Sequence, residues 1–414
     1  MKQKINPVHV GVIGTGMISK TYLDTLTSRF DIIQVDAVAD RHIEKAQKTA
    51  EKYGIRGCTI DELLAESDID LVLSLTPPVA HEEIVTKILN AGKHAYTEKC
   101  FALDLETARR MCALAEEKQL FLGTAPDTFF AGWVQTARQV IDSGALGTIT
   151  SFALHGNRDN ERMLGAMDYM NRPGGGVILD YSVYYLTVLV NLLGPVRRVS
   201  ASIKAPYPTH VNQFELSPHF GEVIDTPNES QFYSLMELEN GISGTLSINS
   251  DSVFFDQTYF AIYGSKGILY LSCPDHFNGT VKLYENTYDF AKADKPELRE
   301  VENPYGFNVE SRGVGVADLA WAIREGRELR ASGKTACHVL DIQACMVESD
   351  RQNSAFVEVM TTCHRAVSLH IPTDGEESSL RTETICRRKT ECVINFQKIS
   401  SGVLPPPPSR LRAA

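Results

Sequence analysis

The chain has 414 residues, a formal net charge of -11 and 43% hydrophobic residues, values that suit a globular protein of two domains. Because the body is acidic, we expect no binding to nucleic acid or to an anionic membrane surface. No apolar run approaches the roughly 20 residues of a membrane helix, so no membrane partner is expected either. The nine cysteines show no metal-ligand spacing, so no metal site is predicted. Without a signal-peptide pattern, the expectation is a cytoplasmic protein with reduced thiols.

The first 125 residues alternate short apolar strands with helices, which predicts a doubly wound parallel sheet of the Rossmann type. Strands are predicted at 9–13, 32–38, 71–75, 94–96 and 121–123. Helices are predicted at 17–30, 42–53, 61–66, 81–90 and 105–118. We therefore assign residues 1–125 to a domain that binds NAD or NADP.

The glycine-rich turn after the first strand carries this assignment. Gly14 and Gly16 let the backbone approach a pyrophosphate, and the amides near Met17 and Ile18 would point at the anion. Asp40 ends the second strand, where a carboxylate accepts a hydrogen bond from the ribose 2'-hydroxyl and repels a 2'-phosphate. The alternative is an ordinary strand–helix turn. NAD is favoured over NADP, although the neighbouring Arg41 could stack on adenine or receive a phosphate.

Residues 126–372 predict a second α/β domain with an open, largely antiparallel sheet for substrate binding and oligomer contacts. Its strands are predicted at 148–155, 196–204, 232–238, 242–249, 259–263, 267–271 and 280–284. Its helices are predicted at 133–143, 178–193, 315–325, 338–349 and 354–363. An exposed sheet face would leave an apolar patch, so we expect a homo-oligomer. Residues 373–414 are polar and basic, and read as a tail that is either disordered or foreign to the natural protein.

Four segments carry a family resemblance: the turn with Gly14, the run 76–81 (TPPVAH), the tripeptide 98–100 (EKC) and the stretch 174–184 (GGGVILDYSVY). In this order and spacing they resemble the Gfo/Idh/MocA family, named for glucose-fructose oxidoreductase, inositol dehydrogenase and rhizopine catabolism. The resemblance covers residues 7–372. It implies a Rossmann domain joined to an α/β domain with an open sheet, and a nicotinamide-dependent oxidoreductase.

The resemblance also implies roles for individual residues. Thr76, Pro77 and His81 would lie beside the nicotinamide ribose, and Glu98 would contact the cofactor or fix its neighbour. Lys99 would be the catalytic amine, since a partly desolvated lysine at the carboxyl edge of a sheet can orient or deprotonate a substrate hydroxyl. The plain alternatives are a polar residue at a helix start for His81 and a surface lysine for Lys99.

On the helix predicted over 178–193, the spacing places Asp180, Tyr184 and Thr187 on one face. Asp180 would orient a sugar, and Tyr184 would share proton transfer if Lys99 lowers its pKa. The alternative for Tyr184 is a core aromatic side chain with a satisfied hydroxyl. Residues near the end of the strand at 148–155 are further substrate candidates or simply loop surface: His155, Asn157, Arg158 and Asp159.

Three positions depart from the family pattern. Tyr184 stands where the family usually has histidine, although some members share tyrosine there, and Ser182 replaces a glycine. Cys100 replaces the proline that follows the lysine, and a cis bond before cysteine costs about 2.5–4 kcal/mol. We therefore expect a trans Lys99–Cys100 bond, or a cis bond held by packing.

These features together predict an NAD-dependent dehydrogenase for a secondary hydroxyl of a sugar or glycoside, with oxidation at C3 of a glycoside as one form. One alternative keeps the cofactor bound and recycles it between two sugar substrates, and another passes the oxidised sugar to a partner that eliminates its aglycone. The alternative from another class is a regulatory protein that senses NAD and a sugar without turnover. Three intact candidates for chemistry, Lys99, Asp180 and Tyr184, argue against the sensor.

Overall fold

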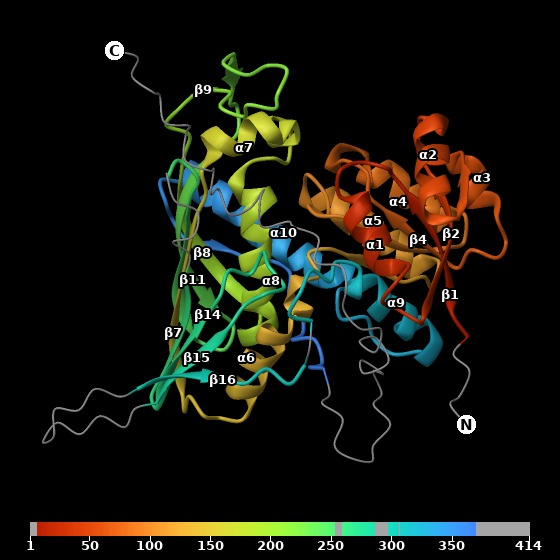
Figure 1. The fold of residues 1–414 in the computed structure, drawn as a ribbon. Coiled ribbons are helices and arrows are strands. Elements are labelled where there is room, and N and C mark those ends of the chain that lie inside the picture. The colour runs from red at the N-terminus through yellow and green to blue at the C-terminus, as the bar shows by residue number, and fades with distance from the viewer. Residues whose placement is uncertain (1–5, 253–258, 286–296, 306, 370–414) are drawn as a thin grey trace, which may run out of the picture.

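The computed structural model describes residues 6–252, 259–285, 297–305 and 307–369, so the tail predicted for 373–414 lies outside the described residues. Two layered units lie side by side, one around a parallel sheet and one around a larger sheet (Figure 1). The helices of the second unit lie between the large sheet and the first unit (Figure 1).

The first unit is a six-stranded sheet in the order β3-β2-β1-β4-β5-β6, with every neighbouring pair parallel. Its strands are β1 (Val8–Ile13), β2 (Ile33–Ala39), β3 (Arg56–Cys58), β4 (Leu71–Ser74), β5 (His94–Thr97) and β6 (Leu122–Thr124). Its helices are α1 (Ser19–Leu26), α2 (Ile43–Tyr53), α3 (Ile60–Ala65), α4 (His81–Asn90) and α5 (Leu105–Glu117). This strand order confirms the doubly wound Rossmann sheet, and β3 is the strand that the sequence analysis missed.

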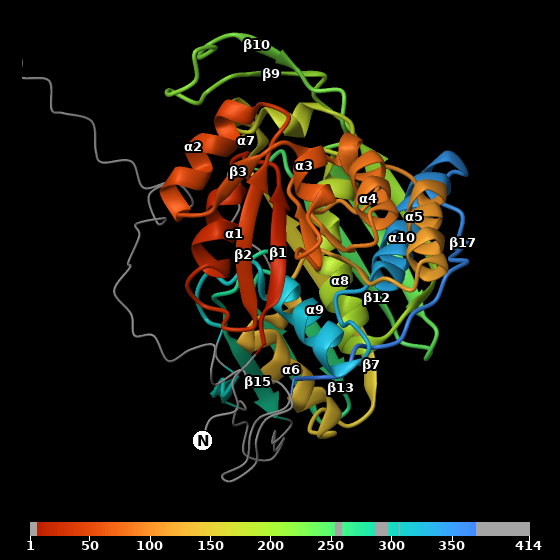
Figure 2. The same cartoon turned by 90° about the vertical axis from the view of Figure 1, so that its right-hand side faces the viewer.

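Helix α1 is shorter than the 17–30 that was predicted. Toward its end, hydroxyl side chains donate to nearby carbonyl oxygens: Thr25 to Tyr22 at 2.9 Å, Thr27 to Leu23 at 2.6 Å and Ser28 to Asp24 at 2.5 Å. Such local bonds to the backbone compete with continued helix, which accounts for the end at Leu26. Figure 2 shows α1 and α2 beside β1 and β2.

The second unit is a nine-stranded sheet in the order β16-β15-β14-β13-β7-β12-β11-β8-β17. Only the β7–β12 pair of this sheet is parallel, which confirms the largely antiparallel sheet. The strands are β7 (Ile149–Asn157), β8 (Val196–Lys204), β11 (Gln231–Leu238), β12 (Ser243–Asn249), β13 (Tyr259–Gly264), β14 (Gly267–Leu271), β15 (Val281–Glu285), β16 (Leu298–Val301) and β17 (Val357–Glu358). A separate pair is formed by β9 (Thr209–Val211) and β10 (Val223–Asp225).

Further helices follow the first unit in the chain. They are α6 (Gly132–Asp142), α7 (Asn160–Ala166), α8 (Ser182–Leu193), α9 (Val314–Glu325) and α10 (Gly333–Arg351). Short 3-10 turns occur at Pro78–Ala80, Thr128–Phe130 and Asp168–Asn171. Figure 1 shows α6, α8 and α10 on the inner face, and among the described residues no helix lies on the outer face.

Two helix predictions in this unit are wrong. The stretch 178–193 is not one α-helix, because a π-helical turn over Val177–Tyr181 precedes α8. The helix predicted for 354–363 is absent. Asn353 and Ser354 take left-handed φ values of 55° and 62°, which end the helical path after α10, and β17 then pairs with β8.

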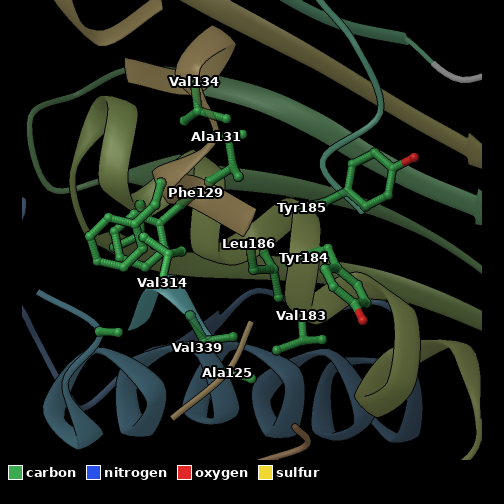
Figure 3. Close-up of a cluster of buried hydrophobic side chains, with 14 of the residues drawn as sticks. Ala125, Phe129, Ala131, Val134, Val183, Tyr184, Tyr185, Leu186, Val314 and Val339 are labelled. Carbon is green, nitrogen blue, oxygen red and sulfur yellow. The ribbon is translucent and has the colours of Figure 1, made fainter. Parts of the chain in front are cut away.

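Helices α9 and α10 return to the first unit after the large sheet. Ser332, just before α10, bridges to Gly123 of β6, and the amide of Thr124 donates to the carbonyl of Ala331 at 3.0 Å. Figure 3 shows Val339 of α10 beside Val183 and Leu186 of α8. The two units therefore share a core, and the edge of the Rossmann sheet faces α8.

The outer face of the large sheet exposes aromatic and aliphatic side chains, among them Tyr233, Leu235, Tyr259 and Tyr270. Over the described ranges we found no helix both long and apolar enough to cross a membrane. The same ranges hold no group of three or more His, Cys, Asp or Glu side chains arranged to bind a metal ion.

Candidate active site

The turn after β1 has the backbone form that close approach to a ligand requires. Gly14 has a φ of +107°, and a Cβ there would lie 2.8 Å from the carbonyl oxygen of Leu75. A Cβ at Gly16 would meet nothing within 4 Å, so the space in front of this turn is open. Met17 is exposed and Ile18 partly so, and α1 begins only at Ser19. The residues of this turn fit a pyrophosphate lying against Gly16.

Asp40 lies beside this turn at the end of β2. Its Oδ2 accepts hydrogen bonds from the amide and the hydroxyl of Thr15, at 2.9 and 2.7 Å, and its Oδ1 accepts one from the amide of His42 at 3.0 Å. Burial opposes the charge of Asp40, but these hydrogen bonds outweigh it and lower its pKa. A negative carboxylate is thus fixed where a ribose would lie. Arg41 beside it is exposed.

The loops that follow β4 and β5 at this edge both contact the side chain of His81. Its Nδ1 lies 2.8 Å from the carbonyl oxygen of Cys100, and its Nε2 lies 2.9 Å from that of Thr76. The imidazole is completely buried, and burial lowers its pKa. His81 therefore positions the loops, whereas Thr76 is partly exposed and Pro77 is exposed at the edge.

The side chain of Glu98 is held by hydrogen bonds from two neighbouring groups. Tyr22 of α1 donates its hydroxyl to Glu98 Oε1 at 2.6 Å, and the amide of Lys99 donates to Oε2 at 2.9 Å. This arrangement orients the backbone just before Lys99. The Lys99–Cys100 peptide bond is cis, the second of the two expected forms, and not trans.

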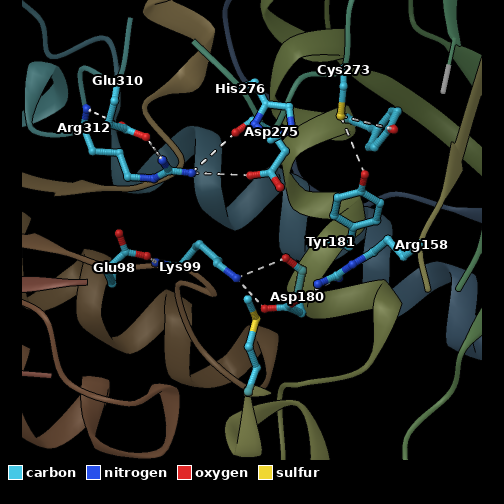
Figure 4. A network of polar contacts seen from close by, with 12 residues as sticks. Glu98, Lys99, Arg158, Asp180, Tyr181, Cys273, Asp275, His276, Glu310 and Arg312 are labelled. Carbon is cyan, nitrogen blue, oxygen red and sulfur yellow. Dashed lines mark hydrogen bonds and ion pairs between the residues drawn. The ribbon is translucent and has the colours of Figure 1, made fainter. Parts of the chain in front are cut away.

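Lys99 forms an ion pair with Asp180, and Asp180 also pairs with Arg158 (Figure 4). Lys99 Nζ contacts Asp180 Oδ1 and lies 3.3 Å from its carbonyl oxygen, while Arg158 Nη1 lies 3.0 Å from Oδ2. The side chains of Lys99 and Asp180 are only 14% and 5% exposed. The buried carboxylate of Asp180 therefore forms ion pairs with two buried cations, Lys99 and Arg158.

The pKa values of this cluster follow from that arrangement. Burial disfavours the charged form of each group. The attraction of Lys99 and Arg158 outweighs this effect and lowers the pKa of Asp180. Asp180 in turn outweighs burial and raises the pKa of Lys99 well above its usual value. The resting site therefore holds an ammonium, a carboxylate and a guanidinium.

Two tyrosine rings flank the ammonium of Lys99. Lys99 Nζ lies 5.5 Å from the ring centroid of Tyr184 and 5.6 Å from that of Tyr169. Lys99 lowers the pKa of Tyr184, but burial outweighs it, so the net pKa is raised and the hydroxyl stays protonated. Lys99 thus acts on the pKa of Tyr184 in the expected direction, but the net lowered pKa that a proton-transfer role was expected to need is not found. The side chain of Tyr169 is 39% exposed.

The segment that carries Asp180 is held by Glu229, which the sequence analysis did not single out. Glu229 Oε1 accepts a hydrogen bond from the amide of Ile178 at 3.0 Å, and its carbonyl accepts one from Val177 at 3.1 Å. A Cβ at Gly176 would lie 2.2 Å from Glu229 Oε1, so glycine leaves room for this carboxylate. A third cation, Arg312, lies nearby with Glu310 and Asp275 (Figure 4). No local pattern pointed to Glu229, because its partner Ile178 lies 51 positions away in the chain.

Not all predicted substrate residues join this cluster. His155 bonds to Ser247 at 2.8 Å and packs beside the exposed Tyr259, so it lies on the outer face of the large sheet. Asn157 is buried at the end of β7, and Asp159 caps α7. Thr187 lines a small internal cavity with Cys100 and Gln343. The structure thus gathers Lys99, Asp180, Tyr184 and Arg158, and places Thr187 and His155 elsewhere.

A Rossmann unit with an open-sheet unit, and a lysine–aspartate pair between them, define the class of dinucleotide-binding oxidoreductases. The family model for the oxidoreductase family with an NAD-binding Rossmann fold matches residues 8–125, and the GFO/IDH/MocA C-terminal domain matches residues 134–270. The chain belongs to the Gfo/Idh/MocA family, as its motifs indicate.

Relatives and solved structures agree with this placement. An uncharacterised oxidoreductase of Schizosaccharomyces pombe is 31% identical over 229 residues, 53% of this chain and 61% of the relative, so the chain spans less than two thirds of it. D-glucoside 3-dehydrogenase of Escherichia coli K12 is 28% identical over 264 residues, 62% of this chain and 71% of the relative. Levoglucosan dehydrogenase in complex with NADH superposes with a TM-score of 0.75 at 20% identity, covering 86% of this chain and 100% of that one. This superposition supports the fold.

Proposed function

We propose that the protein is an NAD-dependent dehydrogenase acting on a secondary hydroxyl of a sugar or glycoside. The observation that carries the proposal is the buried Lys99–Asp180 ion pair at the carboxyl edge of the Rossmann sheet, beside the open turn at Gly16. The named activity of a glucoside 3-dehydrogenase relative supports a glycoside, with oxidation at C3 as the specific form.

The residues present fit a nicotinamide dinucleotide. Gly14 and Gly16 would admit the pyrophosphate, the exposed Met17 and the partly exposed Ile18 would border it, and Asp40 would accept a ribose hydroxyl. The negative charge fixed at Asp40 favours NAD over NADP, with Arg41 the one adjacent cation that could receive a phosphate. When bound, the cofactor supplies the hydride acceptor or donor.

Lys99 would move the hydroxyl proton. Because Asp180 holds Lys99 protonated, the ammonium is ready to give a proton to a carbonyl oxygen when the substrate is reduced. In the oxidation direction the amine must first lose that proton, so we expect the rate to rise with pH. Tyr184, kept protonated by burial, would donate a hydrogen bond to the substrate oxygen rather than act as a base.

Arg158, one of the predicted substrate candidates, and Tyr169, which was not predicted, extend this site. Arg158 occupies the second oxygen of Asp180 and packs 4.4 Å from the ring centroid of Tyr181. It would thereby share the negative charge that stabilises the Lys99 ammonium. The partly exposed ring of Tyr169 offers an apolar face on which the ring of a sugar could pack.

The setting that we propose is a cytoplasmic homo-oligomer. The aromatic side chains on the outer face of the large sheet support contact with a second copy, because such a face is otherwise an apolar patch in water. Light scattering on the purified chain tests this, and a monomer contradicts it.

The test of function is the near-UV absorbance of reduced nicotinamide, followed with purified protein, added NAD and a panel of free sugars and glycosides. A rise with one substrate class supports the dehydrogenase. No rise, even in an amount stoichiometric with the protein, favours the sensor that binds NAD and a sugar without turnover.

A further inference from the structure

Two thiols far apart in the sequence meet where α5 of the first unit packs against α10. The Sγ atoms of Cys112 and Cys337 lie 3.3 Å apart, although the residues are separated by 225 positions. Neither belongs to a disulfide bond. Both thiols lie outside the Lys99 site, so nothing in the proposed function accounts for this contact.

The local packing brings the two sulfurs together. Gly333 opens α10, and a Cβ there would lie 3.0 Å from Cys112 Sγ, so glycine lets this sulfur lie against the first turn of the helix. An ion pair between Lys334 Nζ and Glu116 Oε1, at 2.9 Å, joins the same two helices one turn along α5. The two helices are therefore held in a fixed approach around the thiols.

The pair is also prepared for reaction. The hydrogen bond from Cys112 favours the thiolate of Cys337 and, with the positive charge of Arg109, lowers its pKa against the effect of burial. The same bond raises the pKa of Cys112, which keeps its proton. A thiolate is the nucleophilic form of cysteine. Cys112 is partly exposed, whereas Cys337 is buried.

We propose that Cys112 and Cys337 form a modification site at which hydrogen peroxide produces a disulfide bond between α5 and α10. The Cys337 thiolate attacks one peroxide oxygen, the O–O bond breaks and hydroxide leaves, giving a sulfenic acid. Cys112, as its thiolate, then attacks that sulfur, the S–O bond breaks and a second hydroxide leaves. The two sulfurs lose two electrons in total, and the two hydroxides take up the two thiol protons as water. The sulfurs need to approach by only about 1.3 Å to reach bonding distance.

The disulfide bond would link α5 of the first unit to α10, the helix that contacts the segment around Asp180. Further along α10, the side-chain amide of Gln343 donates to Ser182 Oγ at 3.1 Å and to the carbonyl of Ile178 at 2.5 Å. These two residues flank Asp180 in the chain. A covalent link at Cys337 would therefore hold α10, which contacts the Asp180 segment, against α5.

The experiment uses the full chain, fully reduced and then treated with a small excess of hydrogen peroxide. After digestion without reductant, mass spectrometry should find the peptides of Cys112 and Cys337 joined with the loss of two hydrogens. The melting temperature should rise on the order of 3–5 °C, because the link closes a long loop of the unfolded chain. Dithiothreitol should reverse both changes.

Three variants make the test specific. In C112S and C337S the linked peptide and the rise in melting temperature should both disappear, whereas C345S, on the same helix, should keep both. Conversion of Cys337 to sulfinic acid with no linked peptide overturns the proposal. So does an equal rise in melting temperature in oxidised C112S. None of these readouts needs a substrate, so they stand or fall independently of the proposed dehydrogenase activity.

Discussion

The cofactor turn and the Lys99 cluster lie at the same edge of the Rossmann sheet but are built in different ways. The turn comes from a continuous stretch, and its key requirement is backbone geometry at Gly14. The cluster joins Lys99, Arg158 and Asp180 from separate segments, and its requirement is that two cations share one carboxylate in a buried place. Substitutions in the turn should therefore act through the size of the new side chain, and substitutions in the cluster through the charge that is removed.

The largest effect is expected from removing the amine of the cluster. K99M should lower the catalytic rate about 10²- to 10⁴-fold, the range for loss of general acid–base catalysis. Binding of NADH, followed by its fluorescence, should stay near wild type because the turn is untouched. Turnover at an undiminished rate would contradict the assignment of Lys99.

Removing the shared carboxylate tests the charge balance. D180N should destabilise the fold by about 3–5 kcal/mol, since it leaves two buried cations without their anion. Denaturant unfolding measures this, with D36N as a control at a partly exposed Asp. A D180N variant as stable as D36N would show that the cluster does not depend on the pair.

The two glycines of the turn form a matched pair. G14A should destabilise the protein by about 1–3 kcal/mol, because its φ of +107° and the nearby Leu75 carbonyl exclude a side chain. G16A should leave the melting temperature unchanged, since its Cβ meets open space, yet weaken NADH binding. Equal melting temperatures for the two variants would count against this account of the turn.

Substitutions of Arg158 test, through the pH dependence of the rate, whether Lys99 and Arg158 share the charge of Asp180. In R158M, Asp180 acts on Lys99 alone, so the raised pKa of Lys99 should rise further. Because oxidation needs the neutral amine, the acidic limb of the rate profile should move to higher pH. R158K should bring the limb back toward wild type, and identical limbs in both variants would argue for a packing role only.

The smallest effect is expected at Asp40. D40S should raise the ratio of kcat/KM for NADP over NAD by roughly tenfold, because about 1.4 kcal/mol of repulsion toward a 2'-phosphate is relieved. Parallel assays with the two cofactors measure the ratio. An unchanged ratio would move the choice of cofactor to another residue, with Arg41 the first to test.

The sequence predicted the Rossmann sheet well because each strand and helix carries its own apolar period. Lys99 and Asp180, which the motifs single out, form an ion pair in the structure, and their catalytic roles stay predictions. Thr187 lines a small cavity with Cys100 and Gln343, and its role in substrate binding also stays a prediction. The sequence analysis missed Glu229, whose role depends on a partner 51 positions away.

The sequence by itself determined the class of fold, the glycine turn and the two residues Lys99 and Asp180, because these follow from local periods and motifs. Only the tertiary structure decided the charge state of the site, since burial and the contact with Asp180 set the pKa of Lys99, and burial, Lys99 and Arg158 set that of Asp180. It also decided that His81 faces two carbonyls, and that Cys112 meets Cys337. Contacts between distant segments depend on how the layers pack, and no short stretch of sequence records that packing.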